Sequence, residues 1–140
     1  MNTPSIAVTA TPRLTNRKNA LLWTAQILLA ALFVFAAAPK LVGQHTAVQM
    51  FGQIGAGQWL RYFVGAAELA GAIALLIPRL AVLAAIGLAA DMAGATIINA
   101  AVLHSTAIVM TLALGDVLAL IARGRWRGRH PGAPTSRRAG

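Results

Sequence analysis

Glu68, Asp91 and Asp116 are the three acidic residues of the chain, and each lies inside a long apolar run. Where such a run crosses a membrane, a carboxylate at the centre of the bilayer costs about 3 kcal/mol on the insertion scale. It therefore needs a counter-ion, a water-filled cavity or a bound proton. These carboxyl groups are the first candidates for a functional site, and proton exchange is the chemistry that they would support.

Gln26 and Lys40 complete the candidate set, which we expect to form a buried polar cluster. Gln26 lies in the first apolar run at a depth that matches Asp116 in the fourth. Lys40 is the natural counter-ion for Glu68, because a lysine stem lies along apolar surface while its ammonium reaches a polar partner. Glu68 lies roughly 12 Å of helix rise below Leu60, so a direct pair requires the first helix to end below the surface. The alternative is a lysine anchored among lipid headgroups.

The apolar runs cover residues 20–38, 60–78, 80–102 and 106–122. Each is close to the ~20 residues that cross ~30 Å of hydrocarbon as a helix. The stretch 80–122 has no proline and is about twice too long for one crossing, so we predict a tight turn at the polar group of Asn99 and residues 104–106. The sequence predicts an all-α fold, an integral membrane bundle of four transmembrane helices.

The first run also has features of a cleaved signal peptide, because residues 36–38 are three alanines. However, the run is longer than the usual ~7–15-residue apolar core of such peptides. Pro39 also follows the cleavage-like site directly. We predict that this run is retained as a membrane helix.

Polar segments flank the runs. Residues 1–19 carry Pro4, Pro12 and several threonines and are predicted to be a disordered arm. Residues 44–55 have apolar side chains at helical spacing, which predicts a short helix in the outer membrane interface, with a glycine-rich loop as the alternative. Residues 123–140 form a basic tail.

The basic residues predict the orientation in the membrane. If both termini lie on one side, that side holds Arg13, Arg17, Lys18, Arg79, Arg123, Arg125, Arg127, Arg129, Arg137 and Arg138. The other side holds Lys40 and Arg61. Because cytoplasmic segments of membrane proteins carry an excess of Lys and Arg, we predict a protein of the cytoplasmic membrane with both termini in the cytoplasm.

Small residues near two of the acids predict which helix faces turn inward. Gly65, Glu68, Ala72 and Leu75 share one face of the second predicted helix, and Gly87, Asp91, Gly94 and Ile98 share one face of the third. Small residues let helices approach closely, so we expect the carboxyl groups to point into the bundle. The alternative is that they only hydrogen-bond across helices, although such contacts average well under 2 kcal/mol.

Composition excludes several classes of site. The chain has no cysteine, which excludes disulfides, thiol relays and thiolate metal sites. His45 and His104 lie in unrelated loops without a ligand-spacing motif, so we predict no metal site. The net charge of +9 is explained by basic residues that flank membrane helices and meet lipid headgroups, and we predict no nucleic-acid partner.

The order of several motifs resembles the DoxX and DoxX-like family of small bacterial membrane proteins. The matching segments are residues 33–41 (FVFAAAPKL), 65–72 (GAAELAGA) and 76–79 (LIPR), with a looser match at 92–95 (MAGA). The resemblance implies a four-helix protein of the cytoplasmic membrane. Some family members are linked to a quinone-reducing oxidoreductase or to redox-stress complexes.

The resemblance implies an accessory or subunit role in a quinone-linked membrane redox system. Quinone is then the candidate cofactor, and the lipid bilayer, a redox protein or a second copy of the chain are the candidate partners. Two alternatives remain open: a small proton-coupled transporter, and a structural membrane partner without chemistry of its own. No nucleotide motif, cysteine pair or haem-ligand pair is present, and the sequence reveals no specific reaction.

Overall fold

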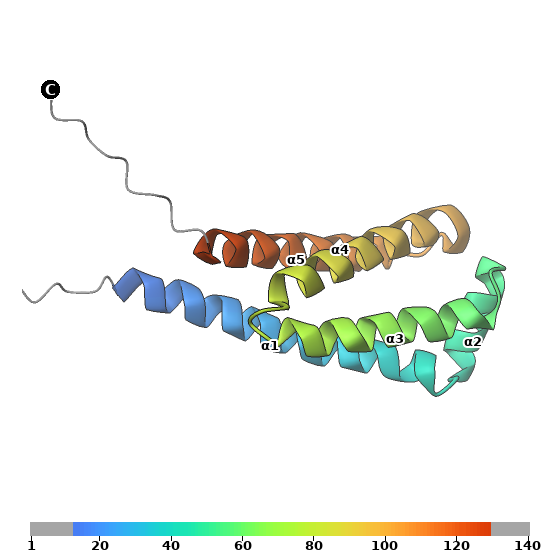
Figure 1. Ribbon diagram of the computed structural model, residues 1–140. Coiled ribbons are helices and arrows are strands. Elements are labelled where there is room, and N and C mark those ends of the chain that lie inside the picture. The colour runs from blue at the N-terminus through green and yellow to red at the C-terminus, as the bar shows by residue number, and fades with distance from the viewer. Residues whose placement is uncertain (1–12, 130–140) are drawn as a thin grey trace, which may run out of the picture.

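The computed structural model describes residues 13–129, and this part of the chain is helical without any strand. Its elements are α1 (Arg13–Leu41), α2 (His45–Ile54), α3 (Gln58–Leu75), α4 (Ala81–Ile98), the π-helical turn η1 (Asn99–Leu103) and α5 (Ile108–Arg129). The predicted all-α class is therefore confirmed (Figure 1).

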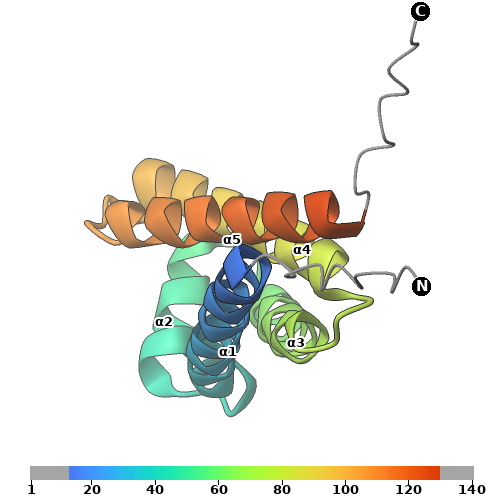
Figure 2. The same ribbon diagram turned by 90° about the vertical axis from the view of Figure 1, so that its left-hand side faces the viewer.

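The helices form two pairs. α1 packs along α3, and α4 packs along α5, while α3 and α4 join the pairs. Figure 1 shows that the beginning of α1 and the end of α5 lie at the same end of the molecule, with α2 at the opposite end. In Figure 2, α1 and α3 are seen nearly end-on while α5 is seen along its length, so the two pairs cross obliquely rather than running parallel.

Two helices are longer than the sequence predicts. α1 begins at Arg13, so residues 13–19 are helical rather than part of a disordered arm, whose first twelve residues lie outside the described part. These seven positions contain neither Gly nor Pro, and Arg, Leu and Lys favour a helix. α5 continues to Arg129, because a glycine costs only about 1 kcal/mol inside a helix and does not end it. Residues 130–140 also lie outside the described part.

The connection between α1 and α3 contains the short helix α2, within the segment where the sequence predicts an interfacial helix. Gly43 makes the turn before it with φ 72°, and Gly55 ends it in the left-handed conformation with φ 77°. Glycine reaches this region without strain. α2 buries Ala47 and Phe51 and contacts both α3 and η1, so it covers one end of the helix pairs.

α4 does not end in a simple cap. It continues into η1, and His104, in the left-handed region with φ 44°, ends that turn. The chain reverses at residues 104–107, within the polar group in which the sequence predicts a turn. The Ser105 amide donates to the Asn99 carbonyl at 3.0 Å, and the Ala107 amide donates to the Ser105 hydroxyl at 3.2 Å. π-Helical turns occur often at functional sites because they displace side chains from the α-helical register.

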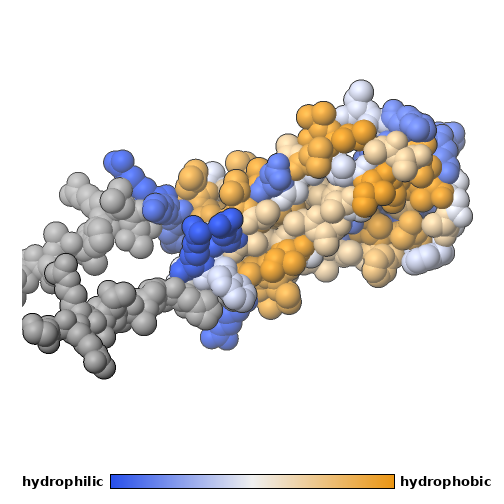
Figure 3. Space-filling model, turned by 90° about the horizontal axis from the view of Figure 1, so that it is seen from above, coloured by the Kyte–Doolittle hydropathy of each residue, from blue (hydrophilic) through white to orange (hydrophobic). Residues whose placement is uncertain are grey.

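The core lies where the two helix pairs meet. Its largest buried apolar residues are Leu29, Phe33, Leu75, Leu88, Met92, Leu118 and Ile121. Many other large apolar side chains are exposed, and Figure 3 shows them over the middle of the molecule, with hydrophilic residues towards both ends. Among the described helices, two segments are long and apolar enough to cross a membrane: Asn16–Leu41 and Ala81–Leu103.

The predicted inward face of α4 is partly wrong. Gly87 is exposed, and the buried residues of α4 are Ala81, Val82, Ala84, Ala85, Leu88 and Met92. The buried stripe of α4 packs its alanines and Leu88 against the neighbouring helices. Gly87 lies on another side of the helix, where Leu83 and Ile86 are exposed as well. The face with Asp91 and Gly94 is half-buried. By contrast, the predicted face of α3, from Gly65 to Leu75, is the buried face.

We expect Gly71→Ala to destabilise the protein by about 1–3 kcal/mol, because an added Cβ would overpack the core. This Cβ would lie 2.6 Å from Leu88 Cδ2 and 2.8 Å from its Cγ. Gly87→Ala is the matched control, since nothing lies within 4 Å of its added Cβ, and alanine stabilises a helix by up to about 1 kcal/mol. The free energy of unfolding in detergent micelles, followed by circular dichroism, tests the pair. Equal effects at both positions would contradict the close α3–α4 contact.

Candidate functional site

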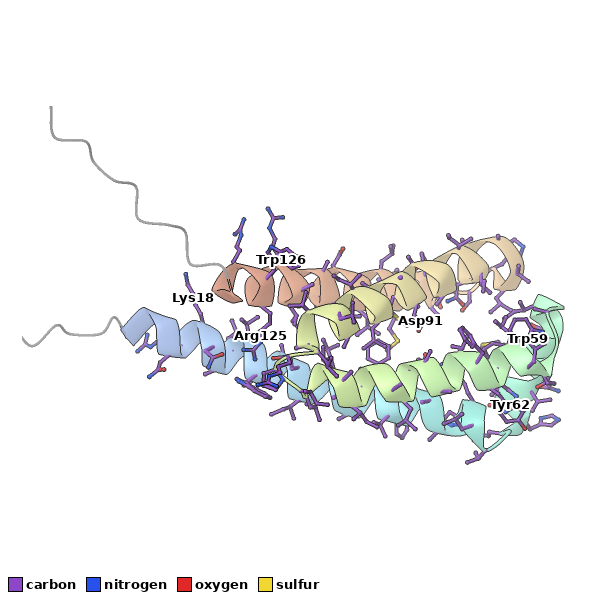
Figure 4. All side chains as sticks on the ribbon, viewed as in Figure 1. Lys18, Trp59, Tyr62, Asp91, Arg125 and Trp126 are labelled. Atoms are coloured by element: carbon purple, nitrogen blue, oxygen red, sulfur yellow. The ribbon has the colours of Figure 1, made fainter. Side chains whose placement is uncertain are left out.

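A cavity of about 600 Å³ lies between the two helix pairs. Residues from α1, α2, α3, α4, η1 and α5 line it, and most of the lining is apolar. Its ionisable lining residues are Lys40, Glu68 and Asp91. Figure 4 shows Asp91 on the side of α4 that faces the α1–α3 pair. The cavity therefore has a polar region in an otherwise apolar wall.

Lys40 and Glu68 form an ion pair in this wall. The Lys40 ammonium donates to both Glu68 carboxylate oxygens, at 2.6 Å to Oε1 and 2.5 Å to Oε2. The side chains are only 15% and 3% exposed, so water screens the pair weakly. The positive charge of Lys40 and the negative charge of Glu68 therefore neutralise each other in an apolar environment.

The position of the end of α1 makes this pair possible. A Cβ added at Gly65 would lie 3.1 Å from both Lys40 Cβ and Leu41 Cγ, so the last turn of α1 rests against Gly65. Gly65 is seven residues into α3, which begins at Gln58. α1 thus ends about 10 Å of helix rise below the start of α3. A direct pair between Lys40 and Glu68 requires the first helix to end deeper than the start of the helix that carries Glu68, and α1 does so.

Asp91 lies on the same cavity without a hydrogen bond for its Oδ2 atom, which is buried. Among the side chains of the described residues, this is the buried polar atom without a partner. Leaving such a group unsatisfied costs about 1–3 kcal/mol, so the position favours a proton, a water molecule or a ligand donor. The cavity thus combines a neutralised ion pair with a carboxyl group that has capacity to bind.

Gln26 is buried but takes part in a contact away from the cavity. The prediction that it forms one cluster with Lys40, Glu68 and Asp91 is therefore wrong. Its side chain is fully buried, and its Nε2 donates to the Leu75 carbonyl at 2.7 Å. Its Oε1 accepts from Arg125 Nε at 2.9 Å and from Arg125 Nη2. Gln26 does not line the cavity. Gln26 joins α1, α3 and α5 at the end of the molecule where α5 finishes.

Asp116 is exposed on α5. The prediction that it belongs to the buried polar cluster is therefore wrong. The inward side of α5 carries Leu114, Leu118 and Ile121. Asp116 lies two residues from both leucines, which is about 200° around a helix and thus on the opposite face. It is not part of the cavity.

Arg61 is the buried charge that sequence reasoning missed, since it was counted as an outer surface residue. It is 3% exposed. Its Nη1 donates to the Lys40 carbonyl, its Nε donates to Gln58 Oε1 at 2.8 Å, and its guanidinium carbon lies 4.1 Å from the centre of the Tyr62 ring. The signal in the sequence is its spacing, because Arg61 falls on the same helical stripe as Gly65 and Glu68.

The cavity opens to the side, between α1 and α5. Phe35 of α1 and Met110 of α5 both line it, although they are 84% and 62% exposed. Side chains that line a cavity and are also exposed mark its mouth. Asn99 of η1 also lines the cavity, and its amide adds hydrogen-bonding capacity to the wall.

His45 and His104, which the sequence assigned no ligand role, lie outside the cavity lining. Within residues 13–129, no group of three His, Asp or Glu side chains is placed to hold a metal ion. The basic stretch after residue 122 is the last part of α5, and its Arg125 stacks 5.0 Å from the centre of the Trp23 ring. This arginine is thus used inside the fold (Figure 4).

Apolar helices, a largely apolar surface and a buried ion pair on an apolar cavity are the features of an α-helical membrane protein with an internal cavity. The model of the DoxX-like family matches residues 24–122. The chain therefore belongs to the DoxX-like family, and the resemblance seen in its motifs is confirmed. No curated protein and no solved structure matches the chain.

Proposed function

We propose that the chain crosses the cytoplasmic membrane four times, through α1, α3, the continuous α4–η1 segment and α5, with both termini in the cytoplasm. The charge distribution supports this orientation, since ten of the twelve basic residues then lie inside. α3 has 18 residues, which give about 27 Å of helix rise, close to the ~30 Å of the hydrocarbon core. The apolar part of α5, residues 108–122, gives about 22 Å, and the arginines that follow it would lie at the cytoplasmic surface.

Reporter fusions test this topology. We expect a periplasm-dependent reporter to be active when fused after Ile54, at the end of α2, and inactive when fused to the C-terminus at residue 140. A cytoplasm-dependent reporter should give the reverse pattern. The same compartment for both sites would overturn the four-crossing arrangement.

We propose further that the cavity binds a membrane-dissolved quinone, and that the protein is an accessory subunit of a quinone-linked redox system. The apolar cavity with hydrogen-bonding groups in one part of its wall carries this proposal. Its volume of about 600 Å³ falls in the range of ~300–1,000 Å³ typical of small-molecule sites. Lys40 and Asn99 can donate hydrogen bonds to quinone carbonyl oxygens, and Asp91 can do so when protonated.

The side opening supports a ligand that comes from the bilayer rather than from water. Phe35 and Met110 at the mouth are apolar and exposed, so in a membrane this opening meets lipid tails. An isoprenoid tail would extend through it while the ring lies near Asp91. Electrons for the quinone would come from a partner protein, since the sequence contains no cysteine pair and no nucleotide motif.

Quinone retention tests the binding. We expect protein purified from native membranes to carry quinone, measured by solvent extraction and ultraviolet absorption. Asp91→Leu should lower retention about tenfold, the effect of losing one buried hydrogen bond of about 1–2 kcal/mol. Asp116→Leu is the matched control, because it removes an exposed carboxylate and should retain quinone like the native chain.

Two results would count against quinone binding: no quinone in the native preparation after addition of excess decyl-ubiquinone, or equal loss in the Asp91 and Asp116 variants. The accessory role has a separate readout, which is a redox enzyme that co-purifies with the chain. A preparation that holds quinone without such an enzyme would contradict the subunit role and leave the binding site intact.

The unpaired Asp91 oxygen also favours a second candidate, a small proton-coupled transporter, because buried carboxyl groups in membrane helices often carry protons. Quinone binding and proton-coupled transport predict different effects of Asp91→Asn. This variant keeps hydrogen-bonding capacity but cannot exchange a proton. Proton-driven solute uptake into proteoliposomes that is abolished by Asp91→Asn would support transport, and uptake that is absent in the native chain would exclude it for that solute.

A further inference from the structure

We propose that Arg61 is the positioning residue of the Lys40–Glu68 pair. It holds the carboxyl end of α1 at the depth where the Lys40 ammonium meets the Glu68 carboxylate. The proposal deepens the proposed function, since this pair forms part of the polar wall of the cavity. It concerns the geometry of the pair alone, so it can fail or hold independently of quinone binding.

The burial of Arg61 requires an explanation. A guanidinium that is 3% exposed loses most of its hydration, which is costly without compensating partners. Among the described residues, the ion pair found is that of Lys40 with Glu68, so the observed partners of Arg61 are a carbonyl, an amide oxygen and an aromatic face. The carbonyl belongs to the end of α1, which carries the partial negative charge of the helix dipole. The helix end thus takes the place of a carboxylate.

Arg61 contacts the main-chain carbonyl of Lys40, the residue whose side chain forms the ion pair with Glu68. At the end of α1, the Ala38 carbonyl accepts from the Val42 amide at 3.0 Å, and the Pro39 carbonyl accepts from the Gln44 amide at 2.9 Å. The next carbonyl, that of Lys40, accepts from Arg61 Nη1. Arg61 therefore satisfies a helix-end carbonyl that would otherwise need another donor, and it does so on the residue whose side chain binds Glu68.

Gly43 folds the turn after α1 over the same guanidinium. A Cβ at this position would lie 3.6 Å from Arg61 Nη1 and 3.7 Å from Nη2. The positive φ of 72° at Gly43 allows the turn to form at this distance without strain. Arg61 thus contacts the end of α1 and the turn to α2 from the first turn of α3.

The three residues form one continuous arrangement along α3. Arg61, Gly65 and Glu68 share the buried face of this helix, and they span about 10 Å of rise. Arg61 binds the main chain of Lys40, Gly65 makes room for that main chain, and Glu68 binds the side chain. One face of α3 therefore binds both the main-chain carbonyl and the side-chain ammonium of Lys40. Loss of Arg61 should therefore loosen the Lys40–Glu68 pair without touching either charged group.

Labelling of Glu68 by dicyclohexylcarbodiimide tests this in native membranes, with adducts located by peptide mass spectrometry. This reagent enters membranes and reacts with protonated carboxyl groups, and an unpaired buried carboxylate is neutralised by a proton. Exposed Asp116 serves as the internal reference. We expect the ratio of Glu68 to Asp116 adducts to be low in the native chain, and to rise in Lys40→Met and in Arg61→Met.

Three further variants separate positioning from general loosening. Arg61→Met combined with Lys40→Met should label Glu68 no faster than Lys40→Met alone, because both act on the same pair. Arg61→Lys should label less than Arg61→Met, since it keeps a donor and the charge. Trp59→Leu, a change to an exposed residue in the same turn of α3, should leave the ratio native.

The proposal is overturned if Arg61→Met leaves the Glu68 ratio native while Lys40→Met raises it, because Arg61 then does not act on the pair. It is equally overturned if Lys40→Met has no effect, or if the double variant labels faster than Lys40→Met. If Arg61→Met does not assemble, Arg61→Gln takes its place, because it also removes the charge, and a native Glu68 ratio in Arg61→Gln overturns the proposal.

Discussion

Lys40→Met is expected to destabilise the protein by about 3–5 kcal/mol, because removing one partner of a buried ion pair leaves the other charge uncompensated. Glu68 would be left without its counter-ion at 3% exposure and would have to take up a proton, which contributes to this loss. Glu68→Gln should cost a similar amount by leaving the Lys40 ammonium without its carboxylate. The double variant should lose little more than either single one, because the pair is already broken by the first change.

The measurement is the free energy of unfolding in mixed detergent micelles for the native chain, both single variants and the double variant. Lys18→Met is the control, since Lys18 is an exposed lysine on the same helix, and exposed charges contribute about 0–1 kcal/mol. Fully additive losses for Lys40 and Glu68 would contradict the pair. A Glu68→Gln variant as stable as the native chain would contradict the predicted loss, and native quinone retention in this variant would restrict Glu68 to helix packing.

Gln26→Leu is expected to cost about 3 kcal/mol, because it removes the hydrogen bond to the buried Leu75 carbonyl and the charge-assisted bonds from Arg125 together. The volume of the side chain changes little, so the loss reports hydrogen bonding rather than a cavity. Unfolding in detergent micelles again measures it. The structural reason for so large an effect is that Gln26 connects three helices at a point with no exposure to water.

Thr24→Ala is the control for Gln26, since the Thr24 hydroxyl is exposed and donates to the Ala20 carbonyl within the same helix. Its loss should change the stability by less than about 0.5 kcal/mol. A Gln26→Leu variant as stable as Thr24→Ala would show that this contact does not hold the helices together.

The sequence predicted what depends on local patterns. Apolar length located the helices, and small residues around Glu68 identified the buried face of α3, because both signals lie within one helix. The pairing of Lys40 with Glu68 could be proposed from their types. Its geometry could not, since it depends on how far α1 ends below the start of α3, which is set by the turn at Gly43 and by Arg61.

The remaining errors concern relations between helices. Asp116 and Gln26 were placed in one cluster from their depth alone, but depth does not determine the direction in which a side chain points. Asp116 lies about 200° around α5 from Leu114 and Leu118 and is exposed. Gln26 binds the Leu75 carbonyl and Arg125 rather than lining the cavity. Arg61 was missed because a basic residue near a helix end is usually solvated.

The continuous helix from Ile108 to Arg129 has a consequence for how this chain can vary in length. Each added or deleted residue turns everything beyond it by about 100°. One residue inserted between Leu118 and Arg125 would therefore turn the Arg125 guanidinium away from Gln26. One residue inserted at 104–107, before α5 begins, would leave Leu118 and Arg125 in the same relative orientation around the helix. Natural length variation in homologues should gather in that turn and be absent from the last turns of α5.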